Sequence, residues 1–160
     1  MSIVVGLDAS AASDVALAKA LELVEGDETI HVVHVVSQIE LDATGELTFE
    51  DKRARVLERT FPEIWKRVRR IAEERGKSDD EAERALDVQL RFAPVHVTAF
   101  QRKTAEELVT AMDDYRARLL VLGREGRPGS VAENVLASGR IERETADAGA
   151  PHGIVLRRRG

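Results

Sequence analysis

Apolar residues in this chain fall into short continuous runs separated by longer stretches with helical spacing. Apolar and β-branched residues predominate at positions 3–5, 29–36, 119–122 and 153–156. Such runs, bounded by glycine or polar residues, are typical of strands that are buried on both faces of a parallel sheet. Residues 86–100 alternate well enough for one more strand, and Pro94 predicts that this strand lies at an edge or ends there.

The first two predicted helices lie between these strands. One follows Ser10 and Ser13, which are both N-cap candidates, and ends at Gly26. The other has an apolar stripe that continues to about residue 75. Pro62 interrupts this stripe and leaves open whether it forms one kinked helix or two.

The last two predicted helices each begin at a capping box, which is a Ser or Thr followed three residues later by Glu. Thr104 begins one whose buried stripe ends at Tyr115, and Ser130 begins a short one that ends at Gly139. Residues 140–148 are predicted to form a further helical piece.

Five strands that alternate with four helices predict an α/β fold. Such a chain forms a three-layer, doubly wound and mainly parallel sheet with right-handed crossovers. Residues 37–50 lack a clear period and are predicted to be a loop. The chain is predicted to be a single domain over positions 1–160. A sheet of this kind binds ligands at its carboxyl edge, where the strand order reverses.

Composition narrows the classes of function. The chain has no cysteine, which excludes disulfides, a thiol nucleophile and cysteine metal sites, and its four histidines show no metal-ligand spacing. The net charge is −5 with both signs mixed, so nucleic acid is not an expected partner. The N-terminus has neither a signal-peptide pattern nor a membrane span, and a cytoplasmic location is predicted.

The segment at residues 119–140, LLVLGREGRPGSVAENVLASGR, has the pattern of a ligand-binding loop. An apolar run stops at Gly123, and Gly126 and Gly129 follow closely. Glycines behind a buried strand let backbone amides approach a phosphate without a Cβ in the way, although the same residues also fit a tight strand-to-helix turn. Asp8 ends the first strand, and it fits either a ligand-binding carboxylate or a cap for the next helix.

Two parts of the sequence resemble the universal stress protein family. IVVGLDAS at residues 3–10, followed by an alanine-rich helix and IHVVHVV at 30–36, is similar to the family's first β-α-β unit. KTAEELVTAMDDYRARLLVLGREGRPG at 103–129 is similar to its third helix, fourth strand and glycine loop. The resemblance covers essentially the whole chain. It implies the adenine nucleotide alpha-hydrolase-like fold with strand order 3-2-1-4-5, in which Asp8 and Gly123 face one crevice.

Nucleotide-binding members of the family carry two glycines separated by two residues, then nine residues, and then Gly followed by Ser or Thr. GREG at residues 123–126 is similar to the first half of this pattern. For the second half, GSVAE at 129–133 resembles the family motif but leaves only two residues between glycines, whereas Gly139-Arg140 leaves twelve. The second alignment is preferred because it inserts or removes fewer residues. It replaces the usual hydroxyl with Arg140, whose cation can pair with a phosphate or occupy its place.

The resemblance therefore implies a site for ATP or another adenine nucleotide, with or without Mg²⁺. Its adenine side is expected to consist of Gly6, Leu7, Asp8 and the backbone of Val35. The ribose and phosphates are expected to lie against Leu122, Gly123, Gly126, Gly129, Gly139 and Arg140.

Two functions remain open at this point. The first is an ATP-binding regulatory module of the stress response, with at most slow ATP hydrolysis because no catalytic base is evident. The second is a stress protein that binds no nucleotide and acts as a dimeric interaction module, which Arg140 and the altered glycine spacing favour. The resemblance implies a homodimer through the last strand, where Ile154, Val155 and Leu156 would need cover if they formed an edge.

Overall fold

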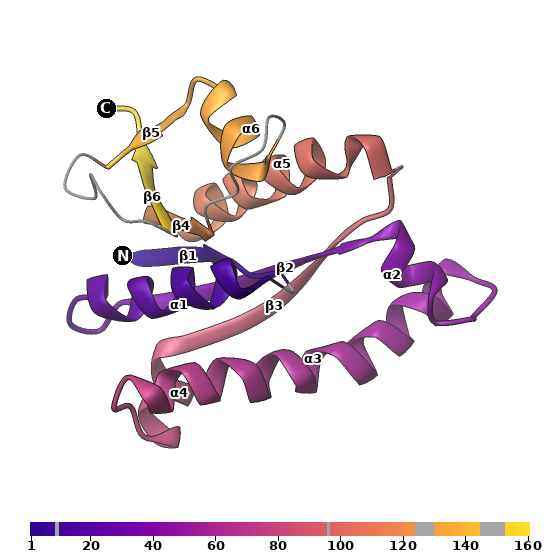
Figure 1. Ribbon diagram of the computed structural model, residues 1–160, viewed down its shortest axis with the longest axis horizontal. Coiled ribbons are helices and arrows are strands. Elements are labelled where there is room, and N and C mark those ends of the chain that lie inside the picture. Colours follow the sequence, from indigo (N-terminus) through magenta and orange to yellow (C-terminus); the bar gives the residue numbers. More distant parts are fainter. Residues whose placement is uncertain (9, 96, 124–129, 145–152) are drawn as a thin grey trace.

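The computed structural model describes residues 1–8, 10–95, 97–123, 130–144 and 153–160. The strands that these residues form build a six-stranded sheet with the order β3-β2-β1-β4-β6-β5 (Figure 1). β1 to β4 pair in parallel, whereas β6 is antiparallel to both β4 and β5. The strands are β1 (Ser2–Gly6), β2 (Thr29–Ser37), β3 (Leu86–Ala93), β4 (Ala117–Gly123), β5 (Ile141–Arg143) and β6 (Gly153–Arg158).

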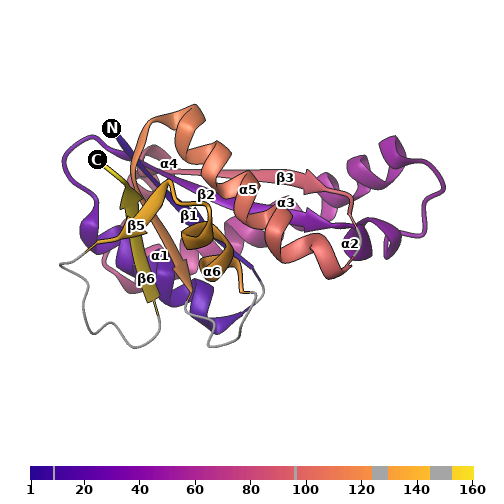
Figure 2. The same ribbon diagram turned by 90° about the horizontal axis from the view of Figure 1, so that it is seen from above.

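Helices cover both faces of the sheet. α1, α3 and α4 lie on one face and α5 and α6 on the other (Figure 1), while α2 and the start of α3 extend beyond the sheet (Figure 2). The helices are α1 (Ala11–Leu23), α2 (Gln38–Asp42), α3 (Phe49–Glu74), α4 (Asp79–Ala85), α5 (Val97–Tyr115) and α6 (Val131–Ala137).

The two faces of the sheet contribute to two separate parts of the core. In β1, Ile3 and Val5 pack into the cluster that contains α1 and α3 residues, whereas Val4 packs into the cluster that contains α5 residues. This alternation follows from the period of two along a strand. The central strands are therefore apolar at successive positions, as the sequence pattern predicts.

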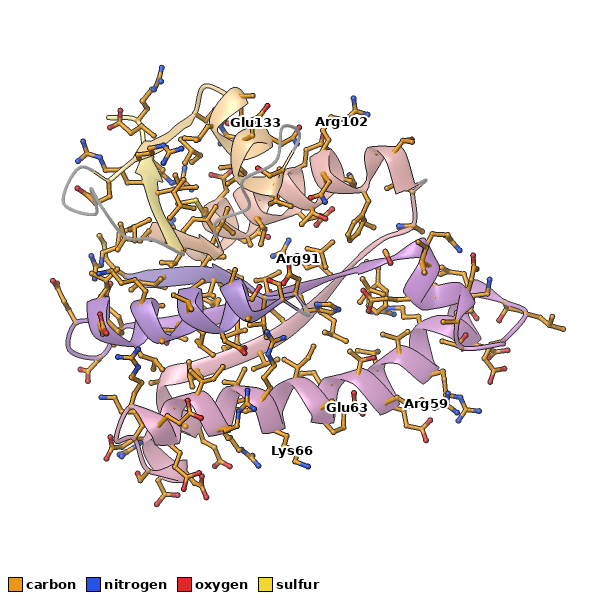
Figure 3. The ribbon with its side chains drawn as sticks, in the orientation of Figure 1. Arg59, Glu63, Lys66, Arg91, Arg102 and Glu133 are labelled. Carbon is orange, nitrogen blue, oxygen red and sulfur yellow. The ribbon has the colours of Figure 1, made fainter. Side chains whose placement is uncertain are left out.

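The apolar stripe of α3 is the face of this helix that packs against the sheet. Ile64 and Val68 are buried against the sheet, while the exposed side chains of Arg59, Glu63 and Lys66 point away from it (Figure 3). Because one face of the helix is apolar and the other is charged, burial against the sheet fixes its orientation.

The α/β architecture, the helices on both faces and the order of the first four strands are confirmed. β3 lies at an edge and ends at Ala93, directly before Pro94, as predicted. The predicted N-caps of two helices are also confirmed, since Ser10 caps α1 and Ser130 caps α6.

The predictions for the end of the chain were wrong in two respects. Residues 141–143, predicted to be helical, form β5, so the sheet has six strands instead of five. β6 is not an edge, because it pairs with β4 on one side and with β5 on the other. Ile154, Val155 and Leu156 are at most 5% exposed within this pairing. A three-residue strand is too short for its period to be read from sequence.

Two helix predictions were also wrong in detail. α5 begins at Val97, so Phe100 is helical and Thr104 lies inside the helix. No glycine or proline separates residues 97 and 104, and a capping-box pattern also occurs within helices. Residues 37–50, predicted to be a loop, contain α2. For the stretch around Pro62, where the sequence left one helix or two open, the structure has the single helix α3.

Within the described residues, no helix is both long enough and apolar enough to cross a membrane.

Candidate functional site

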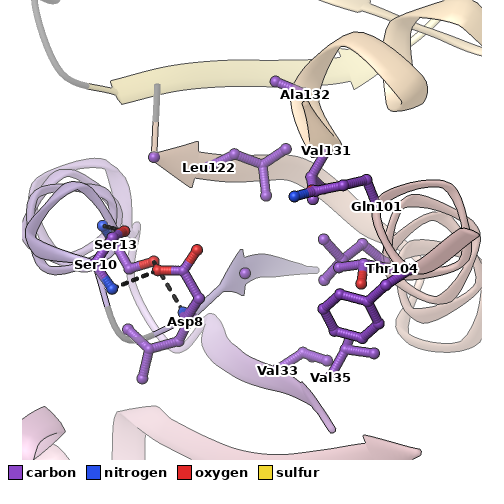
Figure 4. A pocket seen from close by; sticks show the side chains of 15 residues that line it. Asp8, Ser10, Ser13, Val33, Val35, Gln101, Thr104, Leu122, Val131 and Ala132 are labelled. Atoms are coloured by element: carbon purple, nitrogen blue, oxygen red, sulfur yellow. Dashed lines mark hydrogen bonds between the residues drawn. The ribbon is translucent and has the colours of Figure 1, made fainter. Parts of the chain in front are cut away.

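A crevice opens at the carboxyl edge of the sheet, beside the first turns of α5 and α6 (Figure 4). It lies where β1 and β4 are neighbours and their crossover connections lead to opposite faces. Doubly wound sheets bind ligands at such a point because the two loops diverge there. Its lining residues are Gly6, Leu7, Asp8, Ser10, Ser13, Val33, Val35, Phe100, Gln101, Thr104, Leu108, Leu122, Gly123, Val131 and Ala132.

Asp8 organises the loop between β1 and α1. Its carboxylate Oδ1 accepts hydrogen bonds from the Ser10 main-chain N–H and from the Ser13 hydroxyl, both at 2.7 Å. The Ser13 hydroxyl in turn accepts a hydrogen bond from the Asp8 N–H at 2.9 Å. Oδ1 of Asp8 therefore orders the turn that precedes α1, while Ser10 itself caps the helix. No hydrogen bond to a described residue involves Oδ2, which is available to a ligand.

Asp8 is ionised at neutral pH. Partial burial of the carboxyl favours its neutral form, but the hydrogen bonds from Ser10 and Ser13 and the nearby charge of Arg67 outweigh this effect. Together they hold the pKa of Asp8 below its usual range. The site therefore presents a fixed negative charge and a hydrogen-bond acceptor on this side.

Arg67 on α3 braces the same loop from outside the crevice. Its guanidinium donates to the main-chain carbonyl oxygens of Asp8 and, at 2.8 Å, of Ser10. The Nε atom also donates to a carboxylate oxygen of Asp14 at 2.5 Å. Sequence analysis missed this residue, because nothing in a run of charged helical residues shows which arginine reaches a distant loop.

His34 on β2 contacts the main chain just after the end of β1. Its Nδ1 lies 2.9 Å from the Leu7 carbonyl oxygen and its Nε2 lies 3.0 Å from Oε2 of Glu40 on α2. Both partners are acceptors, so the doubly protonated ring satisfies both contacts. Burial alone would lower the pKa of His34, but Glu40, the Leu7 carbonyl and Asp8 outweigh it and raise this pKa. His34 is therefore a hydrogen-bonded strand residue that supports the fold next to the crevice.

Gly123 is required where β4 meets α1. A Cβ atom on this residue would lie 2.8 Å from the main-chain carbon of Ala12 and 2.8 Å from its Cβ. Real Cβ atoms do not approach so closely, so any side chain here would force α1 away from the sheet. The close approach keeps the loop after β1 and the end of β4 within one crevice.

The wall opposite Asp8 comes from α5. Phe100, Gln101, Thr104 and Leu108 line the crevice at helical spacing. Sequence analysis missed this wall because residues up to Phe100 were assigned to a strand and Thr104 to a cap. The spacing of three and four residues between these positions is the signal that could have found it.

Six of the ten residues predicted for the site line this crevice, namely Gly6, Leu7, Asp8, Val35, Leu122 and Gly123. Gly126 and Gly129 lie outside the described residues. Gly139 and Arg140 are not among the lining residues. Arg140 instead donates to Oδ2 of Asp113 at 2.9 Å and is largely exposed.

The region after the glycines fits the alignment that was not preferred. Val131 and Ala132, directly after Ser130, line the crevice. Val131 and Ala132 of the GSVAE motif therefore belong to the site, whereas Gly139, just after α6, has a left-handed conformation with φ +74°.

The titratable groups within the described ranges form no cluster of three or more side chains placed to hold a metal ion. His31 and His34 point to opposite faces of the sheet, as the period of two along a strand requires. His31 stacks on Tyr115 of α5 and bonds Asp87, while His34 contacts Glu40 on the other side.

Fold and crevice together define a doubly wound α/β protein with a cavity at its topological switch point. The sequence profile of the Universal stress protein family matches residues 1–141. The chain belongs to this family. A comparison with curated proteins finds no match.

Solved structures agree with this assignment. A universal stress protein family member from Burkholderia pseudomallei is 26% identical, with a TM-score of 0.51 over 87% of this chain and 89% of that one. The hypothetical proteins MJ0577 and PH0823 are similar in fold, at 17% and 15% identity and TM-scores of 0.56 and 0.54. Each of these two matches covers 85% of this chain and 87% of the other.

Proposed function

We propose that this protein is a nucleotide-binding regulatory module of the stress response that holds ATP or another adenine nucleotide in the crevice between β1 and β4. The observation that carries the proposal is the division of the crevice into two chemical sides. Ionised Asp8 lies on one side, and Val33 and Val35 of β2 together with Leu108 of α5 supply the apolar surface of the crevice. A nucleoside matches this arrangement because its base is a flat, largely apolar ring with polar edges.

Each side has a distinct role in the proposal. The apolar surface removes the faces of the base from water, while Oδ2 of Asp8 accepts a hydrogen bond from an N–H or O–H group of the nucleoside. Because a carboxylate repels phosphate, the phosphates are expected to point away from Asp8, towards the part of the crevice lined by Val131 and Ala132. The expected contact of Arg140 with phosphate is not retained, since its guanidinium is paired with Asp113.

Isothermal titration with ATP tests this function, after denatured protein has been checked for co-purified nucleotide. Wild-type protein is expected to bind in the micromolar range. Asp8→Ala should bind at least about tenfold more weakly, because it loses the acceptor and the turn that Oδ1 holds. The absence of bound nucleotide, together with no heat up to millimolar ATP, would leave the alternative of an interaction module without nucleotide.

Homodimer formation is a second proposal, which rests on family membership. The last strand was expected to form the interface, but its residues Ile154, Val155 and Leu156 are buried and pair with β4, and residues 156–158 also pair with β5. We therefore place a dimer that uses this side of the sheet at the outer edge of the short strand β5. Light scattering after size exclusion measures whether the protein is a dimer in solution.

A further inference from the structure

Thr104 carries a buried hydroxyl that has no hydrogen-bond partner. Its Oγ1 atom exposes less than 1 Å² and contacts no donor or acceptor within the described residues. Such a group destabilises a folded protein, because it has lost its water without gaining a partner, and it is rare in native structures. A buried hydroxyl of this kind calls for an explanation.

The position of this side chain points to the crevice. Thr104 lies inside α5, where it caps nothing, and it lines the crevice between Phe100 and Leu108. Asp8 and Thr104 lie on opposite sides of the cavity, with Val33 and Val35 below (Figure 4). The hydroxyl is therefore a polar point in the apolar half of the site.

We propose that Thr104 is a specificity-determining residue that hydrogen-bonds the edge of the nucleoside base from the side opposite Asp8. This inference rests on the proposed nucleotide function. A hydroxyl both donates and accepts, so it can pair with a ring nitrogen or an exocyclic amino group. A purely apolar ligand would leave it unpaired. Thr104 thus selects a nitrogen-containing aromatic ring over a hydrocarbon of the same shape.

Contact of a base with the hydroxyl requires a side-chain movement, because Oγ1 exposes less than 1 Å². Phe100 is half-buried, lies one helical turn before Thr104 on the same face of α5 and also lines the crevice. In the proposed complex the Phe100 ring turns aside and packs against the base.

The test compares Thr104→Val, which removes the hydroxyl at nearly constant shape, with Thr104→Ser, which retains it. Thr110→Val is the matched control, because Thr110 lies on the same helix, is exposed and does not line this crevice. Isothermal titration is performed with ATP, adenosine and inorganic tripolyphosphate, and the melting temperature of each protein is measured without ligand.

Thr104→Val is expected to bind ATP and adenosine about tenfold more weakly, which corresponds to one lost hydrogen bond. Its affinity for tripolyphosphate should not change, and its melting temperature should equal or exceed that of the wild type. Thr104→Ser and Thr110→Val should bind ATP within about twofold of the wild type.

Three results would overturn the inference while the proposed function stands. They are unchanged ATP affinity in Thr104→Val, an equal loss of tripolyphosphate affinity, or a marked fall in its melting temperature, which would make the hydroxyl structural. If wild-type protein binds neither ATP nor adenosine, both the inference and the proposed function fail.

Discussion

The guanidinium of Arg67 donates a hydrogen bond to the main-chain carbonyl oxygen of Asp8, although the two residues are 59 positions apart in the chain. The same side chain holds the carbonyl oxygen of Ser10. His34 faces the carbonyl oxygen of Leu7. Three carbonyl groups after β1 are thus held by side chains outside the crevice, which leaves the Asp8 side chain to the inside.

Replacement of Arg67 with methionine is expected to loosen this loop. The substitution removes hydrogen bonds from a charged donor that is 22% exposed, so the free energy of unfolding should fall by about 1–2 kcal/mol. ATP affinity should fall as well, because Asp8 is no longer held in place. Urea unfolding and isothermal titration measure the two effects.

Arg70→Met is the matched control for this prediction. Arg70 is 61% exposed and approaches Asp14 only at 3.7 Å, so its loss should change stability by less than about 0.5 kcal/mol. Equal effects of the two substitutions would show that Arg67 acts through its general charge and not through the carbonyl groups.

Gly123→Ala is expected to destabilise the protein by about 1–3 kcal/mol, because the added Cβ overlaps main-chain atoms of Ala12 that cannot move independently of α1. Gly153→Ala is the control, since the nearest atom to its Cβ would be 3.8 Å away. Thermal unfolding of both variants tests the difference. Similar melting temperatures would contradict the close contact between β4 and α1.

Stability is expected to depend on the protonation of His34. Its pKa is raised in the folded protein, so its contribution is fully present below the unfolded value of about 6.5 and is lost as the pH rises through the folded pKa. Urea unfolding between about pH 5.5 and 8.5 should therefore show this loss in the wild type and not in His34→Gln.

Glu40→Gln provides an independent check on His34. Burial, which lowers the pKa of His34, remains in this variant while the favourable charge of Glu40 is removed. NMR titration of the ring should therefore give a lower pKa than in the wild type. An unchanged pKa would show that Glu40 does not stabilise the imidazolium.

Because β6 lies inside the sheet, a charge placed in this strand should prevent folding. Val155 is 2% exposed, so Val155→Asp should leave the protein unfolded, since the folded state would bury an unpaired charge. Arg159→Asp, at a side chain that is 61% exposed, should leave it folded. Circular dichroism and size exclusion distinguish the outcomes. A folded monomer of Val155→Asp would instead support the original expectation of a dimer through an exposed last strand.

Sequence patterns were sufficient for the parts of the fold where burial is continuous. The apolar runs of β1, β2 and β4 are covered on both faces, so their composition alone identifies them. The turn at Asp8 was also predictable, since an aspartate between a strand and Ser10 has few other arrangements.

The remaining features depend on contacts that no local pattern contains. β5 is held by its pairing with Arg158 and Leu156 and by the burial of Ile141 in the core, neither of which a three-residue pattern shows. The residues around Thr104 have the pattern of a helix N-cap, but Thr104 lines the pocket. Only the start of α5 at Val97 shows that Thr104 is inside the helix and does not cap it. Arg140 lies near a glycine that resembles the family motif, yet its ion pair with Asp113 holds it elsewhere.

The most direct test of nucleotide binding in this crevice is the change in backbone amide NMR shifts when ATP is added to labelled protein. The account predicts saturable shifts at Leu7, Asp8, Thr104 and Gly123, with little change at Gly139 and Arg140. The absence of any shift at millimolar ATP, or shifts centred on Gly139 and Arg140, would contradict it.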